Sequence, residues 1–413
     1  MGNKPRIRFK GFTEDWEQRK LSELATMNAR IGWQNLRTSE FLDSGDYLLI
    51  TGTDFDNGRI KYGTCHYVEK KRFDQDTKIQ LSTGSILITK DGTLGKVALV
   101  EELPKPATLN AGVFNVRVKD DAVLSYKYLY HYLKAPFLMK YVTANATGGT
   151  IKHLNQSILV DFPIPITEKL EQDRIAKLLD SLELSITLHQ CKLEKLKLTK
   201  KALLQKLFPK NGKHIPEIRF KGFTDAWEQR KLGEIGKWYK GIGGTKDDLN
   251  TKQSGRMFVH YADLYQTSEF LSNVVHWTIN EIIGALIAPN SILFPMSDVT
   301  PYGLARTTSC KLKDVRAGGD VLINTIDTNI DSDFVSIYIN LFSKNILPFV
   351  TGTTVKHINS KSLSELTILI PSFEEQVKIV NLVKFYNEII TLHQRKLERL
   401  QEVKKGLLQK MFV

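Results

Sequence analysis

The sequence has little cysteine, and none of it is arranged for chemistry. Its three cysteines are Cys65, Cys191 and Cys310, which form no Cys-x-x-Cys pair. The pattern excludes a disulfide framework, and a reducing cytoplasm fits it best. There is no apolar run of about 18 residues, so we expect no membrane span, and the first residues lack the apolar core of a signal peptide.

Catalytic signatures are missing as well. The segment DGTLGKV at 91–97 fails as a P-loop because Lys96 is followed by Val97, and GIGGTK at 241–246 is no dinucleotide fingerprint. We find no nucleophile elbow, no His-Glu-x-x-His, no Cys/His zinc spacing and no Asn/Asp-Pro-Pro-aromatic motif of amino-methyltransferases. These absences argue against an enzyme that works alone.

What the chain does have is length and positive charge. A chain of 413 residues exceeds one ordinary core, so two or more domains are expected. The formal net charge is +13, and the isoelectric point is about 9.3. Such a balance favours a polyanionic partner such as nucleic acid, although charge alone is also compatible with a protein that is merely kept soluble.

The sequence contains two copies of one unit. IRFKGFTEDWEQRKL begins at Ile7 and IRFKGFTDAWEQRKL at Ile218, with thirteen of fifteen positions identical. TGGTIKHL at 147–154 returns as TGTTVKHI at 351–358, and LHQCKLEKLKLTKKALLQKLF at 188–208 returns as LHQRKLERLQEVKKGLLQKMF at 392–412. Matching ends therefore enclose diverged middles, which is a two-fold internal duplication and not a solenoid.

The first part of each copy has a mixed pattern. Short β-branched runs at 85–89 and 291–295 predict strands. Apolar spacing over 125–142 and over 333–347 predicts helices. The fold class predicted for this part is therefore mixed α/β, with helices and strands interspersed (α+β).

Each copy ends in a predicted long helix with heptad spacing. Apolar positions recur every seventh residue over more than four heptads, a pattern typical of a coiled coil. The seam is Ile175, Leu179, Leu182, Ile186, His189, Leu193 and Leu196 in the first helix, and Ile379, Val383, Tyr386, Ile390, His393, Leu397 and Leu400 in the second. We expect the two helices to pair as an antiparallel coiled coil with an internal pseudo-two-fold.

Polar residues also fall on this seam. His189 and His393 occupy equivalent positions, and we expect them to fix register and not to bind metal, since no second ligand stands beside either at helical spacing. Lys200 and Lys404 likewise match each other, and we expect their ammonium groups to reach out to solvent.

The combination resembles a known family. Tandem diverged α/β domains, each closing with a Thr-Gly-x-Thr-x-Lys-His segment and a Glu-Gln step into a heptad helix, resemble the specificity subunit of type I restriction-modification enzymes. The Glu-Gln steps read PITEKLEQDRIAKLLD at 165–180 and PSFEEQVKIVNLV at 371–383. The resemblance spans essentially the whole chain.

The resemblance implies a non-catalytic, sequence-specific DNA-binding subunit of a bacterial defence complex. Target-recognition domains would occupy 1–167 and 211–371, and spacer helices 168–210 and 372–413. Each domain would read one half of an asymmetric bipartite target in double-stranded DNA, and the helices would set the spacing and dock two modification subunits. S-adenosylmethionine, ATP and Mg would belong to the modification and restriction subunits, with no cofactor or metal in this chain.

Residues in loops are the candidates for DNA contact. Glycines at 92 and 95 allow a tight turn after the strand at 85–89, close enough for phosphate or base contact, although an ordinary glycine turn is the alternative. The candidates are Arg59, Lys61, Lys90, Thr93, Lys96 and Lys152 in the first copy and Ser297, Thr300, Tyr302, Arg306 and Lys356 in the second. Lys152 and Lys356, shared by both copies, suit a backbone clamp or a purely structural turn equally.

Two further questions stay open in the residues themselves. Trp16 and Trp227, inside the twin openings, are expected to pack each domain against a helix and not to stack on bases. An adaptor with two peptide- or RNA-binding domains, and a DNA enzyme with an unrecognised active site, are the rival functions. The first rival predicts binding without an asymmetric sequence preference, and the second predicts turnover by the purified chain.

Overall fold

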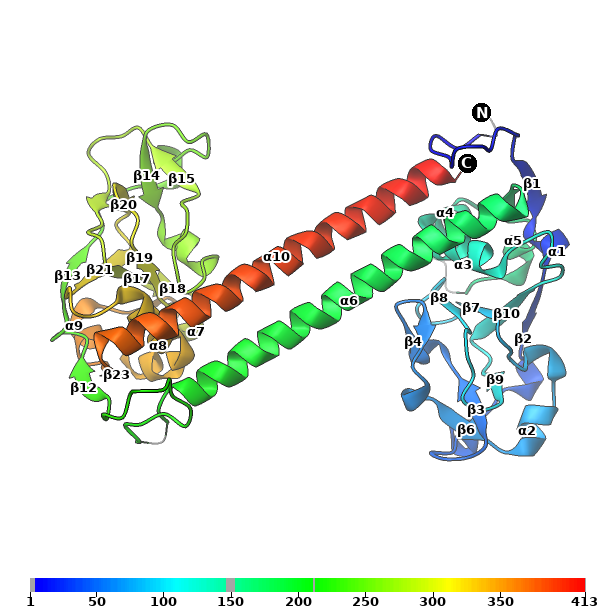
Figure 1. Cartoon of the computed structure of the whole chain (residues 1–413), viewed down its shortest axis with the longest axis horizontal. Helices are drawn as coiled ribbons and strands as arrows, with labels where there is room; N and C mark the ends of the chain where they lie inside the picture. The colour runs from blue at the N-terminus through cyan, green and yellow to red at the C-terminus, as the bar shows by residue number, and fades with distance from the viewer. Residues whose placement is uncertain (1–3, 146–152, 211, 413) are drawn as a thin grey trace. The chain divides into compact units, whose positions relative to one another are not determined.

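The computed structural model describes residues 4–145, 153–210 and 212–412. The chain divides into two compact units (Figure 1). Unit 1 comprises residues 1–190 and 395–413, and unit 2 comprises residues 191–394. Each unit therefore contains one α/β domain, one part of the first long helix and one part of the second.

Unit 1 is built on two sheets that share a core. An antiparallel sheet has the order β2 (Ala25–Ala29), β10 (Val113–Val118), β7 (Ile86–Thr89), β8 (Val97–Leu99). A second sheet has the order β6 (His66–Val68), β3 (Tyr47–Ile50), β9 (Ala107–Leu109), with β3 and β9 parallel. Two small pairs complete it: β1 (Glu17–Lys20) with β11 (Pro163–Ile166), and β4 (Phe55–Asp56) with β5 (Arg59–Ile60).

Unit 2 repeats the strand order of the antiparallel sheet and has one strand more in its second sheet. Its antiparallel sheet runs β13 (Gly236–Lys240), β21 (Val321–Ile326), β17 (Ser291–Pro295), β19 (Thr308–Cys310). Its second sheet runs β15 (His276–Thr278), β14 (Arg256–Val259), β20 (Val315–Ala317), β16 (Ala285–Leu286), with β14 and β20 parallel. The small pairs are β12 (Glu228–Lys231) with β23 (Thr367–Ile370), and β18 (Ser297–Asp298) with β22 (Lys356–His357).

Helices cover one face of each antiparallel sheet. The first domain carries α1 (Leu21–Leu24), α2 (Lys70–Asp74), α3 (Tyr126–Lys134), α4 (Pro136–Asn145) and α5 (Gln156–Leu159). The second carries α7 (Pro301–Leu304), α8 (Ser332–Leu341) and α9 (Ser360–Ser364). The long helices are α6 (Lys169–Leu207) and α10 (Phe373–Met411), each of 39 residues.

Alternation along the central strands separates two cores in each domain. In β7, Ile86 and Ile88 join the core beneath α3 and the long helices, whereas Leu87 joins the core beneath the second sheet. In β17, Ile292 faces the helices and Leu293 faces the second sheet. Both strands are buried on both faces, which explains why they appear in the sequence as continuous apolar runs.

The predicted strands at 85–89 and 291–295 are confirmed, but both predicted domain helices need correction. The helix expected over 125–142 is two helices, because Ala135 precedes Pro136 and has an extended backbone, which restarts the chain as α4. The helix expected over 333–347 ends at Leu341, and a 3-10 segment that contains Pro348 follows it.

The twin opening segments are held by buried ion pairs. Arg8 donates two hydrogen bonds to the Glu171 carboxylate at the start of α6, at 2.8 and 2.9 Å. Arg219 donates two to Glu375 at the start of α10, at 2.9 and 2.8 Å. Each opening segment is thereby fastened to the long helix that leaves its own domain, so its repetition has a structural cause.

The neighbouring glutamines cap the domain helices in the same way. Gln172 accepts a hydrogen bond from the backbone N–H of Ser125, which precedes α3, and Gln376 accepts one from Asp331, which precedes α8. The two residues of the Glu-Gln step therefore act together at the start of each long helix. The glutamate binds the arginine of the opening segment, and the glutamine binds the backbone at the start of the domain helix.

The twin tryptophans are buried, as predicted. Trp16 is 1% exposed and packs edge-on against Tyr128 and Phe412. Trp227 is 1% exposed and packs against Phe208 and Phe334. Each makes an edge-to-face contact with the phenylalanine that directly follows a long helix, so neither ring is available to a base.

Within each unit, a segment of α6 packs antiparallel to a segment of α10. In unit 1 the seam lysine Lys404 of α10 bonds Glu183 of α6, which also bonds Lys134 of α3. In unit 2 the seam lysine Lys200 of α6 bonds Asn387 of α10 and Glu269 of the domain, at 2.7 and 2.8 Å.

These contacts correct the expectation that the seam lysines reach solvent. The Lys200 and Lys404 side chains are 16% and 22% exposed and end on carboxylates. All the seam positions predicted from heptad spacing are buried or half-buried, the two histidines among the half-buried ones.

Candidate nucleic-acid interface

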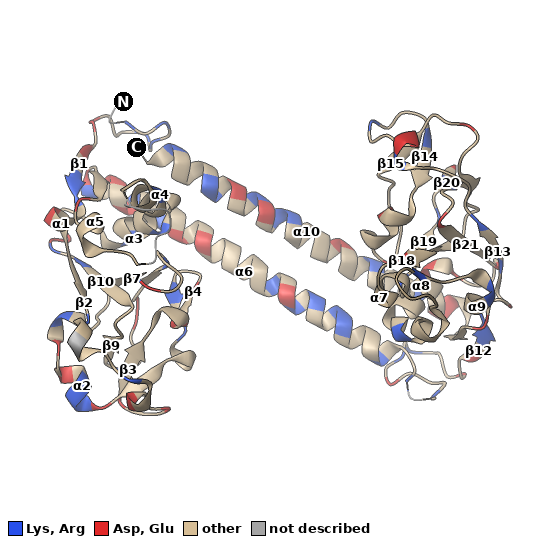
Figure 2. Ribbon diagram, turned by 180° about the vertical axis from the view of Figure 1, so that it is seen from behind, with Lys and Arg blue, Asp and Glu red and all other residues tan. Residues whose placement is uncertain are grey.

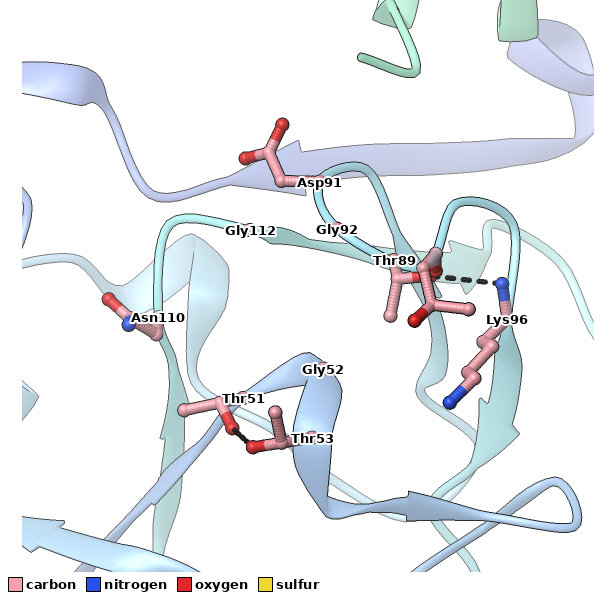
Figure 3. Close-up of a pocket in the computed structure, with 10 residues that line it drawn as sticks. Thr51, Gly52, Thr53, Thr89, Asp91, Gly92, Lys96, Asn110 and Gly112 are labelled. Carbon is pink, nitrogen blue, oxygen red and sulfur yellow. Dashed lines mark hydrogen bonds between the residues drawn. The ribbon is translucent and has the colours of Figure 1, made fainter. Parts of the chain in front are cut away.

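A surface pocket of about 270 Å³ lies where the two sheets of the first domain meet. Figure 3 shows the turn with Thr51 and Thr53 on one side of this pocket and the loop with Asp91 and Lys96 on the other. The lining is Thr51, Gly52, Thr53, Thr89, Asp91, Gly92, Thr93, Lys96, Asn110 and Gly112. It is rich in hydroxyl, amide and amine groups, which suits hydrogen bonding to a polar ligand.

The turn is held by a buried carboxylate. Asp54, 4% exposed, accepts hydrogen bonds from the Thr51 backbone N–H and hydroxyl, at 2.8 and 2.9 Å, and from the Thr64 hydroxyl at 3.0 Å. A 2.7 Å hydrogen bond joins the Thr51 and Thr53 hydroxyls. The turn is thus rigid before any ligand arrives, while Thr53 remains exposed.

The opposing loop is the glycine turn expected from the sequence. Gly92 and Gly95 have φ of 72° and 70°, conformations that favour glycine. The Thr89 hydroxyl accepts the backbone N–H of Lys96 at 2.9 Å, which closes the loop. Thr93 and Lys96 are exposed and line the pocket together, whereas the Lys90 ammonium lies over the Phe114 ring, 5.6 Å from its centroid.

Arg59 and Lys61 lie elsewhere and are already paired. The Arg59 guanidinium bonds Glu101, and the Lys61 ammonium is 3.1 Å from Asp56. Arg59 lines a separate hollow with Glu101, so the structure does not bring these two cations into the pocket that holds Lys96. Lys152 lies outside the described residues.

In the second domain the candidates gather around the β18–β22 pair. Ser297 lies opposite His357 and accepts a hydrogen bond from the Tyr265 hydroxyl on its carbonyl, and Lys356 lies opposite Asp298. The Lys356 ammonium bonds two carbonyls of its own turn, at 2.7 Å each.

Three further candidates follow that pair along the chain. Thr300 caps α7 by accepting the Gly303 N–H, and Tyr302 on that helix is 71% exposed. Arg306 donates to the Leu264 carbonyl at 3.2 Å, and its guanidinium lies over the Tyr265 ring, so it stabilises the turn Tyr261–Tyr265. Among these three, Tyr302 presents the most side chain to a ligand.

The second domain also has a counterpart of the first domain's capped turn. Asp263, 6% exposed, accepts the backbone N–H of His260 at 2.9 Å, as Asp54 accepts that of Thr51. The His260 ring nitrogen Nδ1 accepts the Ala262 N–H, and burial lowers the pKa of His260. His260 and Ala262 line a pocket of about 370 Å³.

Sequence reasoning missed these capped turns. Thr51, Thr53 and Asn110 did not stand out because the residues around them are small and uncharged. The signal that could have found them is an aspartate four residues past the end of each strand, in ITGTDF at 50–55 and VHYADL at 259–264. Alignment of the two copies through their diverged middles would have exposed it.

The basic side chains of the long helices are not confined to one segment. Lys and Arg are spread along both α6 and α10 (Figure 2). No cluster of three or more His, Cys, Asp or Glu side chains suited to a metal occurs within 4–145, 153–210 and 212–412. Over the same ranges, no helix is both long and apolar enough to span a bilayer.

The architecture defines a class of proteins with two tandem α/β domains, each followed by a long helix, and comparison with known sequences identifies the family. The family described as type I restriction modification DNA specificity domain matches residues 13–198 and again 224–402. The chain therefore belongs to the family of type I restriction-modification DNA specificity subunits, with two target-recognition domains.

Curated relatives extend over nearly the whole length. The putative type I restriction enzyme MjaX specificity subunit of Methanocaldococcus jannaschii is 24% identical over 96% of this chain and 92% of its own. The MjaIX specificity subunit of the same organism is 24% identical over 96% and 93%. The solved S subunit from M. genitalium shares the fold, with a TM-score of 0.64, 15% identity and 99% of both chains covered.

These findings confirm the predicted family, the mixed α/β class with two domains joined by two long helices, and the DNA-specificity role. The protein is the non-catalytic specificity component of a type I restriction-modification complex.

Proposed function

We propose that each domain reads one half of an asymmetric bipartite target in double-stranded DNA. The observation that carries this is that the chain contains one structural framework twice, with different side chains on the two capped turns. The antiparallel sheets of both domains have the same strand order, and both domains have the same Arg–Glu clamp. The capped turns, by contrast, present Thr51 and Thr53 in one domain and His260 and Ala262 in the other. Two such surfaces suit two different half-sites.

The long helices act as the spacer between the half-sites. A helix of 39 residues is about 58 Å long at about 1.5 Å per residue. Half-sites about one and a half to two DNA turns apart are separated by about 50–70 Å. The helix length therefore matches a gapped target. In this proposal the recognition domains are 1–167 and 211–371, and the spacer helices are 168–210 and 372–413.

The same helices dock two modification subunits. α6 and α10 expose apolar side chains away from the seam, among them Leu188 at 60% and Leu392 at 65%. Large exposed apolar residues on long helices favour partner binding. The modification subunits carry S-adenosylmethionine and methylate adenine, restriction subunits use ATP and Mg, and the assembly works in the cytoplasm. This chain contributes specificity and no cofactor.

The test is methylation mapping of host DNA with and without this gene, with the modification subunit expressed. We expect N6-methyladenine to disappear at one asymmetric gapped motif. A chimaera with residues 1–167 from another member should then change one half of that motif only. Unchanged methylation with the partner expressed, or a chimaera that changes both halves, would refute the proposal and favour an adaptor protein.

A further inference from the structure

The first capped turn has a fixed direction of hydrogen bonding. The Thr51 hydroxyl has one hydrogen and donates it to the Asp54 carboxylate, which as an anion has no hydrogen of its own to donate. The 2.7 Å contact between the Thr51 and Thr53 hydroxyls must therefore be donated by Thr53. With its hydrogen committed inward, the Thr53 oxygen presents only lone pairs outward, so it is an acceptor.

The turn is placed where a nucleic-acid ligand can reach it. Thr53 is exposed and lines the pocket with Lys96, which is exposed as well. A phosphate held by Lys96 would place the adjoining base edges near the turn. In the major groove, the amino groups that an acceptor can bind are adenine N6 and cytosine N4, whereas guanine O6 and thymine O4 repel an acceptor.

The second domain reverses this polarity in the same framework. Ala262 stands in the place of Thr53 and has no hydroxyl, and His260 stands in the place of Thr51. Because the His260 Nδ1 accepts the Ala262 N–H, the neutral ring carries its hydrogen on Nε2 and is a donor. A donor binds guanine O6 or N7, or thymine O4, and is repelled by amino groups.

We propose that these turns are base-reading elements with opposite preferences: Thr53 accepts a hydrogen bond from adenine N6 or cytosine N4 in one half-site, and His260 donates to guanine or thymine in the other. The inference deepens the proposed function and rests on it. It adds a specificity determinant to each domain and gives the asymmetry of the target a chemical origin.

Substitution of Thr53 tests the first domain. The assay is methylation mapping of the complex with its modification subunit, together with selection of bound duplexes from a randomised library. Thr53→Val keeps the shape and removes the acceptor, so discrimination at one position of one half-site should fall by about tenfold. Thr53→Ser keeps the acceptor and should preserve the motif. Thr83→Val is the matched control, because that exposed hydroxyl bonds the Glu101 carbonyl away from the pocket.

Substitution of His260 tests the second domain. His260→Thr gives the second turn the residue type that the first turn has at Thr51, whose hydroxyl donates its only hydrogen to the capping aspartate. The substitution removes the imidazole donor, so only the other half-site should relax. Thermal unfolding of each complex shows whether the variant is folded.

The outcomes separate this inference from the function on which it rests. If the unsubstituted complex has no bipartite motif, the proposed function fails. If it has one and Thr53→Val leaves both halves unchanged, the function stands and the inference is wrong. Equal loss of specific and non-specific binding by Thr53→Val also overturns it, because a base reader contributes little to non-specific affinity. Relaxation of one position, with Thr53→Ser and Thr83→Val unchanged, supports it.

Discussion

The duplicated Arg–Glu clamp allows one prediction to be tested against its own copy. Glu171 and Glu375 are 0% and 1% exposed, and each accepts two hydrogen bonds from an arginine that is 12% exposed. Replacement of either carboxylate by the neutral amide of glutamine leaves a nearly buried guanidinium without its counter-charge. Loss of one partner of such a pair costs about 3–5 kcal/mol of unfolding free energy.

The two copies differ in one respect that sets the expected order. Glu171 also accepts the Trp16 indole N–H at 3.2 Å and the Thr167 hydroxyl. The Trp227 indole N–H, in the second copy, has no hydrogen-bond partner. Hydrogen bonds to a charged acceptor contribute about 1.5–3 kcal/mol each, and an amide retains part of them. Glu171→Gln should therefore destabilise its unit more than Glu375→Gln does, by about 1–3 kcal/mol.

Hydrogen exchange followed by mass spectrometry measures both units in one molecule. Peptides from β1–β2 report opening of the first unit and peptides from β12–β13 report the second. Each variant should raise exchange in its own unit, with the larger change in Glu171→Gln. The reasoning is refuted if Glu375→Gln lowers the opening free energy of its unit as much as Glu171→Gln does, or more. It is also refuted if both variants lower that free energy by less than about 1 kcal/mol, because the Arg–Glu pairs would then not be a main support of the opening segments.

Three other predictions concern unit 1. Burial raises the pKa of Asp180, but hydrogen bonds from His131 and a neighbouring lysine outweigh it and bring that pKa to about 2. Because the pKa of Asp180 is lower in the folded than in the unfolded protein, its ionised form stabilises the fold above about pH 4, and this stabilisation is lost as the pH falls toward 2. The loss should be about 1–2 kcal/mol in thermal unfolding measured across an acid titration, and Asp180→Asn should abolish this pH dependence. Glu183 is 19% exposed and lies between Lys134 and Lys404, so Glu183→Gln should lower the free energy of unfolding in urea by about 2–3 kcal/mol. Glu217→Gln is the control, because it changes an exposed ion pair and should leave the urea midpoint unchanged. Phe412→Ala removes a ring that is 5% exposed and packs against several aromatics, so it should cost about 3–5 kcal/mol, and a melting temperature equal to that of the unsubstituted protein would contradict the packing.

The long helices and repeated ends could be predicted because their signals are local. Heptad spacing is a property of consecutive residues, and it gave helices that the structure places at 169–207 and 373–411. The break between α3 and α4 at Ala135 was missed because the helical spacing of apolar residues continues through Pro136. The proline itself was a signal for this break, since it disfavours a helical backbone in the residue before it.

The site was harder to predict because its chemistry is not local. Arg59 looks like a free cation in the sequence, but its partner Glu101 is 42 positions away. The pocket is assembled from turns after β3, β7 and β9, so the fold had to be known before Asn110 and Lys96 could be assigned to one pocket. The role of Thr53 as an acceptor depends on a chain of hydrogen bonds that ends on a buried carboxylate.

The composition of the two units has a consequence for synthesis on the ribosome. Unit 2 is one continuous stretch, 191–394, and all of its contacts are available once that stretch has emerged. Unit 1 needs residues 395–413 as well, and Phe412 and Met411 sit in its core against Trp16. Residues 1–190 are therefore synthesised well before residues 395–413, which complete their unit. Until then the first unit keeps an open apolar surface that chaperones and proteases can recognise, so an interrupted chain would present an incomplete first domain beside a finished second one.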